Sequence, residues 1–444
     1  MRHVVIAGGG ISGLSTAYYL QKAGIRPTLV EKEPKLGGVI RTEVVDGCLV
    51  EGGPEAFLAA KPWAMDLIDD LGLAGEVIGS NDHLRVTYVV RDGKLVPLPE
   101  GLMMMAPTRV WPMVTTRLLS WPAKVRMGLE WFHRKPHASL PDRSVAQFIR
   151  EHYGPEAVDY LTEPLLAGIY GGDSEQMSVR SVLPRFAELE QQYGSVTRGI
   201  LAERKKARGP IFRTLKRGMG QLVDAIASMN PANVVCGPVE ALEHAGTKYR
   251  LRVSGDWMEA DEVALACPAH QAATLVRSIH PKLAGLLAEI PYTSSMTVAL
   301  GYERSAVKHS LNGFGFLVPS RERTGIVAST WVGTKFRYRV PDDKALIRCF
   351  FTRTDLGDSD AIAMARDDLK RLMGFDAQPS FTRIARWPHS MAQYTVGHQQ
   401  RIDAIEQALS SQTGLHLAGN AYYGIGIPDC VRLGKQVAAK ISGP

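Results

Sequence analysis

The chain has 444 residues, of which 45% are hydrophobic, and it carries a formal net charge of +7 at pH 7. A chain of this length can bury a large core and is expected to form two or three domains. It contains no run of about 18 uncharged apolar residues, so no transmembrane helix is predicted. The modest positive charge suits an anionic substrate or lipid surface, and suits equally a basic surface without a partner. We expect no nucleic-acid partner.

The five cysteines, Cys48, Cys236, Cys267, Cys349 and Cys430, are scattered along the chain. No pair has the spacing of metal ligands or of a redox motif, so we expect reduced thiols and no metal site. The first residues already form a predicted strand that leads into a cofactor motif, which argues against a secretory signal. Together these features predict a cytoplasmic protein.

Residues 4–31 are predicted to form a strand, a glycine turn, a helix and a second strand. Gly8 permits the tight turn, Gly10 lets the backbone approach a pyrophosphate, and Gly13 lets the helix pack closely on the strand. The helix N-terminus then offers free N–H groups to the phosphates. Glu31 follows near the expected spacing of ~20 residues and would accept a hydrogen bond from a ribose hydroxyl. The segment predicts a dinucleotide-binding fold.

Two further clusters favour FAD over a nicotinamide cofactor. Gly37 and Gly38 would let the chain pass close to the diphosphate and the flavin, and Arg41 would supply charge there. The Gly52–Glu55 segment would bring backbone close to the isoalloxazine, although an ordinary turn explains that segment alone equally well. Flavoproteins of the glutathione-reductase and amine-oxidase type carry these clusters, and their order along this chain predicts FAD.

The C-terminal segment predicts an apolar strand from Leu415, a glycine-rich loop, and a helix that runs to Ser442. Flavin oxidases of this type close the cofactor site with such a segment. Backbone N–H groups near Ile427, at the start of the helix, would face the pyrimidine edge of the flavin. There they would stabilise negative charge on the reduced ring.

The predicted fold is α/β and has three parts. A discontinuous Rossmann-type FAD-binding domain is expected over residues 1–80, 210–270 and 385–444. A mixed-sheet substrate domain is expected over residues 81–100 and 271–384, which contain runs with the period of strands. These runs lie at 87–90, 296–302, 325–330 and 346–351. The remaining residues, 101–209, predict a helical subdomain.

Within that subdomain, residues 102–136 are rich in Met, Trp and Leu, with basic residues interleaved and prolines that predict short helices. Trp111, Trp121 and Trp131, next to cations such as Arg109 and Lys124, suit a monotopic membrane surface. The alternative is an amphipathic helical unit packed on the core. The first interpretation predicts peripheral association with the inner face of the cell membrane.

Over essentially its whole length, the chain resembles the protoporphyrinogen oxidases of the flavin amine-oxidase superfamily. The most specific stretches are Gly-Ile-Tyr-Gly-Gly-Asp at 168–173 and Gly-Phe-Gly-Phe-Leu-Val-Pro at 313–319. Other matching segments are 51–54, 144–149, 217–220, 264–270 and 419–430. The resemblance and the motifs together predict the following FAD-contacting residues: Gly8, Gly9, Gly10, Ile11, Ser12, Gly13, Glu31, Lys32, Gly38, Arg41, Gly53, Pro54, Glu55, Ala56, Val239, Trp387, Asn420, Ile425, Gly426 and Ile427.

The resemblance implies oxidation of protoporphyrinogen IX to protoporphyrin IX in haem biosynthesis, with oxygen as acceptor and hydrogen peroxide as by-product. Non-covalently bound FAD would carry the difficult step, so no catalytic side chain is expected. The protein's task would be positioning and electrostatics. A monomer or a homodimer is expected.

The substrate pocket should be apolar and should hold a flat macrocycle with anionic propionates. The resemblance implies a close backbone edge at Gly168, Ile169 and Gly171. Phe314, Phe316, Trp331 and Phe350 are candidate walls, with sandwich core as the alternative for each. The arginine that binds a propionate in some relatives falls at Thr87, so Arg85 is the candidate partner, on the same strand face if the strand extends that far. Arg198, Arg204 and Lys205 are further candidate cations.

Three other functions stay open. Coproporphyrinogen III has four propionates instead of two, and its oxidation to coproporphyrin III would call for more cations in the pocket. An amine- or carotenoid-type flavin oxidoreductase would use the same fold, and Tyr422-Tyr423 keeps that reading open. A non-enzymatic flavin-binding partner of haem synthesis is disfavoured by the intact cofactor clusters.

Overall fold

The N-terminal motif folds as the sequence predicts, in a computed structural model that describes residues 2–103, 105–138, 140–203 and 209–443. Strand β1 (Val4–Ala7), helix α1 (Ile11–Lys22) and strand β2 (Thr28–Glu31) form a βαβ unit with parallel strands. Both strands are buried throughout, as expected for a parallel sheet covered on two faces.

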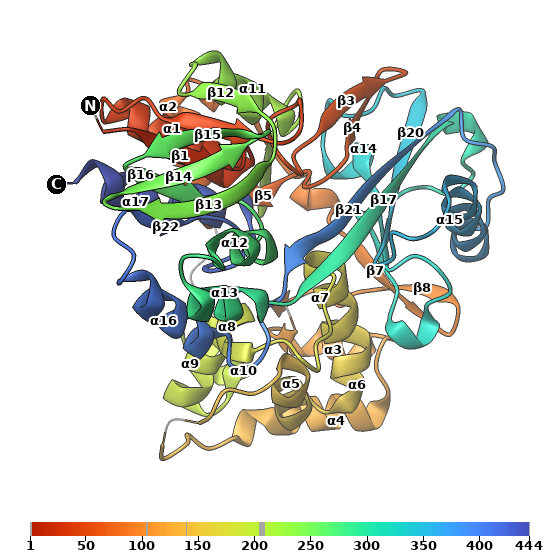
Figure 1. The fold of residues 1–444 in the computed structure, drawn as a ribbon. Coiled ribbons are helices and arrows are strands. Elements are labelled where there is room, and N and C mark those ends of the chain that lie inside the picture. The colour runs from red at the N-terminus through yellow and green to blue at the C-terminus, as the bar shows by residue number, and fades with distance from the viewer. Residues whose placement is uncertain (1, 104, 139, 204–208, 444) are drawn as a thin grey trace.

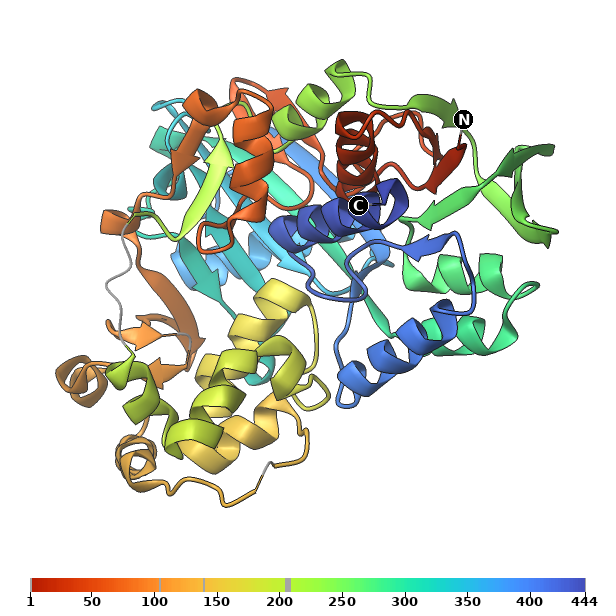
Figure 2. The same ribbon diagram turned by 90° about the vertical axis from the view of Figure 1, so that its left-hand side faces the viewer.

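A five-stranded parallel sheet gathers segments from the whole chain. Its order is β12–β2–β1–β16–β22, with β12 at Asn233–Cys236, β16 at Glu262–Leu265 and β22 at Leu415–Leu417. The last helix, α17 (Ile427–Ser442), packs along α1, and the two lie side by side in Figure 2. Strand β1 therefore pairs with residues more than 250 positions away, and the domain is discontinuous.

Smaller elements surround this sheet. Antiparallel strands β13 (Val239–Ala245), β14 (Lys248–Val253) and β15 (Asp256–Ala260) form one sheet, and β3 (Thr42–Val45) pairs with β4 (Cys48–Glu51). Strand β11 (Phe212–Leu215) lies between β5 (Phe57–Leu58) and β6 (Val77–Gly79). The neighbouring helices are α2 (Trp63–Asp70), α11 (Gly220–Ser228), α12 (Ala269–Val276), α13 (Pro281–Ala288) and α16 (His398–Leu409).

A seven-stranded mixed sheet forms the second part of the molecule (Figure 1). Its order is β21 (Phe381–Ala392), β17 (Tyr292–Glu303), β20 (Lys344–Phe351), β19 (Ala328–Trp331), β18 (Gly315–Leu317), β7 (Thr87–Arg91) and β8 (Lys94–Pro97). Helix α15 (Asp358–Met373) covers one face and closes an apolar core there. The predicted boundary at residue 385 falls inside β21, because that edge strand belongs to this sheet.

The third part is helical and occupies the lower region of Figure 1. Its elements are α3 (Val110–Thr115), α4 (Trp121–Leu129), the 3-10 turn η3 (Glu130–Phe132), α5 (Val145–Tyr153), α6 (Pro155–Ala157), the π-helical turn η4 (Val158–Thr162), α7 (Glu163–Tyr170), α8 (Val179–Val182), α9 (Pro184–Tyr193) and α10 (Val196–Ala202). Pro122 lies in the first turn of α4 behind the Ser120 cap, where its missing N–H costs nothing. No described helix combines the length and apolarity needed to cross a bilayer.

Candidate flavin and substrate site

The glycine turn after β1 is shaped by close backbone contacts at two positions and by open space at a third. A Cβ at Gly8 would lie 2.7 Å from the Ala266 carbonyl oxygen, and a Cβ at Gly13 would lie 1.9 Å from the Gly8 oxygen. A Cβ at Gly10 would meet nothing within 4 Å. Gly10 is also the N-cap of α1 and makes no side-chain cap, so the first helical N–H groups of Ile11, Ser12 and Gly13 stay available. This cradle fits a pyrophosphate.

Glu31 braces the turn from the end of β2. One carboxylate oxygen accepts a 2.6 Å hydrogen bond from the Gly9 N–H, and the other accepts a 2.9 Å bond from the Glu33 N–H. The side chain is therefore held beside the turn, and its hydrogen bond to a ribose stays a prediction. Lys32 is exposed, and its ammonium lies 4.0 Å from the Glu33 carboxylate.

The second glycine pair lies directly against the first turn. The Gly37 N–H donates to the Gly9 carbonyl over 2.8 Å, and a Cβ at Gly38 would lie 3.2 Å from the Gly10 Cα. Arg41 donates to the Leu36 carbonyl over 2.5 Å, so its guanidinium closes this loop. Its role as a charge at the diphosphate stays a prediction.

The Gly52–Ala56 loop joins the same assembly. The Gly52 N–H donates to the Arg41 carbonyl over 2.8 Å, and a Cβ at Gly53 would lie 2.0 Å from the Val39 oxygen. The indole N–H of Trp387 donates to the Gly52 carbonyl over 2.8 Å. The three glycine clusters therefore meet in space, which the sequence predicts only by their order.

Glu55 has partners that the sequence analysis misses. Its carboxylate pairs with Lys335, at the end of α14 (Val332–Lys335), and with Arg348 of β20. Burial raises the pKa of Glu55, but the two cations outweigh it and lower the pKa to about 2. The Glu55 side chain is thus ionised and already paired with two protein cations. Contact of FAD with the Glu55 backbone, and with Pro54 and Ala56, stays a prediction. The available signal was Arg348 itself, a lone charge inside an apolar strand.

The C-terminal loop leads into α17 as predicted. Gly426 is the N-cap, Ile427 is the first helical residue and no side chain caps this end. The Asn420 side-chain amide donates to the Ser390 carbonyl over 3.0 Å, which ties the loop to β21. The flavin contacts of Asn420, Ile425, Gly426 and Ile427, and of Val239 at the start of β13, stay predictions.

Helix α7 brings the predicted backbone edge onto the seven-stranded sheet. A Cβ at Gly168 would lie 3.1 Å from Leu317 Cδ2, so only a glycine allows this close contact without displacing the leucine. Gly171 ends the helix with φ +58°, and Ile169 is 48% exposed. The sequence predicts this edge, and the close approach is observed.

Strand register decides which aromatic side chains can line a pocket. Leu317, Ala328 and Phe350 are register partners, so they share one face, the face that α7 contacts. Phe316 and Trp331 lie in the core under α15, with exposures of 1% and 0%. The prediction that these two side chains line the pocket is wrong, because they are enclosed by protein.

The remaining two aromatic candidates differ from each other. Phe314 is 7% exposed and precedes β18. Phe350 is half-buried on the face toward α7, and the Arg348 guanidinium lies 5.1 Å from its ring centroid. Phe350 therefore stays the best candidate for a substrate wall.

The predicted cations are not gathered into one site. Arg85 is exposed and follows the 3-10 turn at Asp82–Leu84, whereas β7 begins at Thr87. The strand does not extend to Arg85, so the condition for Arg85 to share a strand face with Thr87 is not met, and its contact with a propionate stays a prediction. Arg198 donates to the carbonyls of His133 and Tyr193 inside the helical subdomain. Arg204 and Lys205 lie outside the described residues.

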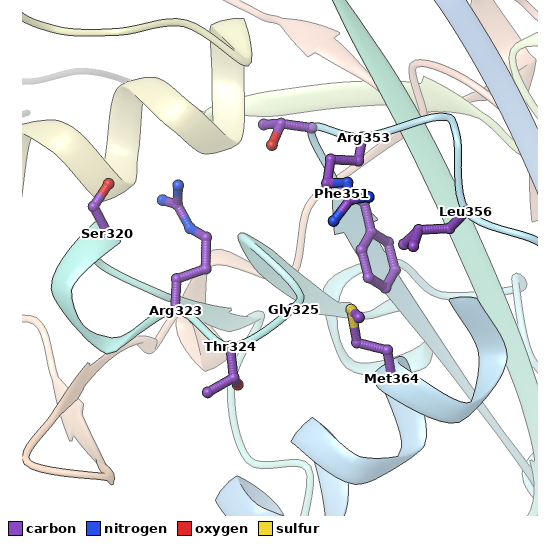
Figure 3. Close-up of a pocket in the computed structure, with 9 residues that line it drawn as sticks. Ser320, Arg323, Thr324, Gly325, Phe351, Arg353, Leu356 and Met364 are labelled. Carbon is purple, nitrogen blue, oxygen red and sulfur yellow. The ribbon is translucent and has the colours of Figure 1, made fainter. Parts of the chain in front are cut away.

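A cavity of about 300 Å³ opens at one end of the seven-stranded sheet (Figure 3). Arg323 and Arg353 extend from opposite sides of it, and each already has a carboxylate partner, Glu163 and Asp355 respectively. Phe351 and Met364 line it from the α15 side. The cavity is thus separate from the Phe350 face, and no predicted site residue lines it.

A buried polar cluster lies in the helical subdomain, away from the glycine clusters. His152 contacts Glu130 at 2.9 Å through Nδ1 and Glu190 at 3.0 Å through Nε2, and Arg143 pairs with Glu190 at 2.6 Å. Glu130, His133 and His152 place possible ligand atoms within 4.8 Å of one another. Hydrogen bonds already occupy Glu130 and both His152 nitrogens, so we interpret the cluster as structural.

This cluster predicts a pH-dependent stability. Burial lowers the pKa of His152, but hydrogen bonds to both glutamates outweigh it and raise the pKa above 6.5. The stability that protonated His152 contributes to the fold is fully present below pH 6.5. It is lost as the pH rises through the raised pKa of His152 in the folded protein. Burial raises the pKa values of Glu130 and Glu190, but their hydrogen bonds and neighbouring positive charges, those of His152 first, together outweigh burial and lower both below 4.5. The stability that these two carboxylates contribute is therefore lost only in more acid solution.

We therefore expect the difference in melting temperature between the parent protein and a His152→Gln variant to be largest from about pH 4.5 to 6.5 and to shrink above that range. Thermal unfolding followed by circular dichroism from pH 4 to 9 measures it. A difference that stays constant over this range would rule out a charged His152.

The chain matches the family described as flavin containing amine oxidoreductase over residues 11–442. It is 35% identical to the coproporphyrinogen III oxidase of Bacillus subtilis over 99% of this chain and 97% of that protein. It is 26% identical to the mitochondrial protoporphyrinogen oxidase of Nicotiana tabacum, covering 98% and 94%. A solved structure from Exiguobacterium sp. 255-15, described as a proposed protoporphyrinogen oxidase, superposes with a TM-score of 0.90 at 29% identity, over 99% of this chain and 98% of that one.

The chain therefore belongs to the flavin-containing amine oxidoreductase family, and its cofactor is FAD, as the sequence predicts. Within that family it groups with the porphyrinogen oxidases, which confirms the resemblance drawn from the motifs.

Proposed function

We propose that this chain oxidises a porphyrinogen to the corresponding porphyrin with FAD as the redox cofactor. One observation carries the proposal: β20 presents Arg348 to the flavin loop and, two residues on along the same face, Phe350 toward α7. Arg348 contacts the predicted flavin loop, and Phe350 lies on the sheet face that α7 contacts, which supports a flavin site and a substrate edge next to each other. A flat macrocycle between Phe350 and the α7 edge would lie next to the cofactor.

The chain's own residues supply position and electrostatics. When bound, FAD would supply the hydride acceptor for a porphyrinogen, whose oxidation is favoured by the gain of aromaticity. Gly168 and Gly171 let the end of α7 pack closely on Leu317 and Met391 respectively, which fixes the backbone edge that we propose lies beside a planar ligand. The uncapped N-terminus of α17 places backbone N–H groups where they favour negative charge. No side-chain acid or base is required.

Between the two substrates, we propose coproporphyrinogen III as the preferred one and protoporphyrinogen IX as the second. Sequence identity supports this order, since the Bacillus subtilis coproporphyrinogen III oxidase is more similar to this chain than the tobacco protoporphyrinogen oxidase is. Substrate choice then depends on carboxylate number, because the two porphyrinogens carry four and two propionates.

Steady-state kinetics on both porphyrinogens, followed by porphyrin fluorescence, test this proposal. We expect the higher kcat/KM with coproporphyrinogen III, by about tenfold or more if one additional charge-assisted hydrogen bond of about 1.5–3 kcal/mol is made. Oxygen uptake with formation of hydrogen peroxide in the same assay tests oxygen as the acceptor. Equal kcat/KM values, or a higher value with protoporphyrinogen IX, would contradict the proposed preference for coproporphyrinogen III. If neither porphyrinogen is oxidised, the proposed porphyrinogen oxidase function is wrong.

We also propose that the helical subdomain docks on the inner face of the cell membrane. Large apolar side chains are exposed together on α3, α4 and η3: Val110 at 80%, Trp111 at 74%, Trp121 at 65%, Leu129 at 55% and Phe132 at 73%. Lys124 lies 4.5 Å from the Trp121 ring centroid, and Arg109 is the N-cap of α3. Aromatic and basic side chains on one surface suit anionic lipid headgroups.

A further inference from the structure

Three side chains of the seven-stranded sheet and its adjoining helix hold the Gly52–Ala56 loop from one side. Arg348 donates from Nη2 to the Gly53 carbonyl over 2.8 Å and from Nη1 to Glu55 over 2.9 Å. Lys335 pairs with the second oxygen of Glu55. Trp387 donates to the Gly52 carbonyl. The loop that the sequence places at the isoalloxazine is therefore fixed by residues about 280 to 335 positions away.

The charges in this cluster do not cancel. The Arg348 side chain is 2% exposed and that of Lys335 is 14% exposed, and within the described residues their one carboxylate partner is Glu55. The adjacent buried pair, Arg339 with Glu51 at 2.8 Å, is balanced. One positive charge is left over in a buried setting, where an uncompensated charge is costly unless an anion is bound nearby.

Arg348 also touches the substrate side. Its guanidinium lies over the Phe350 ring, with the carbon 5.1 Å from the centroid. The same side chain therefore contacts the flavin loop, the buried carboxylate and the half-buried aromatic side chain.

We propose that Arg348 is a positioning residue that raises the reduction potential of the bound FAD. It fixes the Gly52–Glu55 backbone and, with Lys335, keeps one positive charge beside the flavin ring. Reduction makes that ring negative, so the excess charge favours the reduced form over the oxidised form. The inference deepens the proposed function and rests on it for the placement of the loop at the isoalloxazine.

Redox titration of the FAD-loaded protein against dyes of known potential tests this, with no porphyrinogen present. We expect Arg348→Met to weaken the preference for reduced over oxidised FAD about tenfold, a fall of about 30 mV for a two-electron couple. Lys335→Met should shift the potential in the same direction, because it removes a charge from the same carboxylate. Arg348→Lys should keep the potential near that of the parent.

Controls separate charge from structure. Arg383→Met removes an exposed cation of β21 that pairs with Glu43 at 3.0 Å, and it should leave the potential unchanged. If Arg348→Met released its FAD, Lys335→Met would decide the question, because Lys335 makes no bond to the Gly53 backbone. A reduction potential equal to that of the parent in Arg348→Met would overturn the inference. If Arg348→Met does not bind FAD, a potential equal to that of the parent in Lys335→Met would overturn it. A shifted potential in these variants, together with a parent protein that oxidises neither porphyrinogen, would instead overturn only the proposed function.

Discussion

A Gly10→Val variant is expected to fold and to purify without its yellow cofactor. Gly10 has φ −71° and ψ 178°, an extended conformation open to any residue, and its Cβ would face free space. The added methyl groups would fill the volume that the pyrophosphate needs. Losing about two charge-assisted hydrogen bonds to phosphate would cost roughly 3–6 kcal/mol, which weakens FAD binding by about 100-fold or more.

Flavin absorbance per protein and fluorescence titration with free FAD measure this effect. Gly285→Val is a matched control, because it adds the same side chain to α13 at a position where a Cβ also meets nothing within 4 Å. It should retain full FAD. A Gly10→Val protein with parental flavin content would show that the pyrophosphate lies elsewhere.

The second large effect is expected at the lipid surface, in a Trp111→Ser/Trp121→Ser double variant. Both indoles are mostly exposed, so their loss should leave the fold intact. Burial of one such side chain in lipid contributes about 1.5–3 kcal/mol, so loss of the pair should weaken vesicle binding by roughly 100-fold or more. Binding of the parent should also fall with salt, because the basic residues act through screened attraction.

Co-sedimentation with phosphatidylglycerol-containing vesicles over a range of salt concentrations measures both effects. Trp257→Ser is the control, since Trp257 is 39% exposed on β15, outside the helical subdomain. Equal binding of the parent and the double variant at every salt concentration would refute membrane docking through α3 and α4.

The sequence predicts the cofactor half of the site better than the substrate half, and the reason is locality. The roles of Gly8, Gly10 and Gly13 depend on neighbours within one strand–turn–helix unit, so spacing alone is informative. Phe316 and Leu317 are adjacent and both apolar, yet strand register sends one under α15 and the other toward α7. The composition of the strand does not determine which of its side chains face α15 and which face α7.

Charged partners distant in sequence could not be predicted at all. Arg348 and Glu55 are 293 positions apart, and no short motif joins them. The pattern of β20 did hold a clue, since an arginine between Ile347 and Cys349 in a buried strand requires a partner. It gives no indication of which acid that partner is.

The sheet order has a consequence for how the protein is made. Strand β1 pairs with β16, β16 pairs with β22, and α17 packs on α1, so the flavin domain has no complete core until the last helix is available. Ribosomes add about 5–20 residues per second, so this first-made strand spends tens of seconds without its final neighbour. FAD uptake is therefore expected to follow the synthesis of α17, and fragments that end before α17 should be bound by chaperones or degraded without ever carrying flavin.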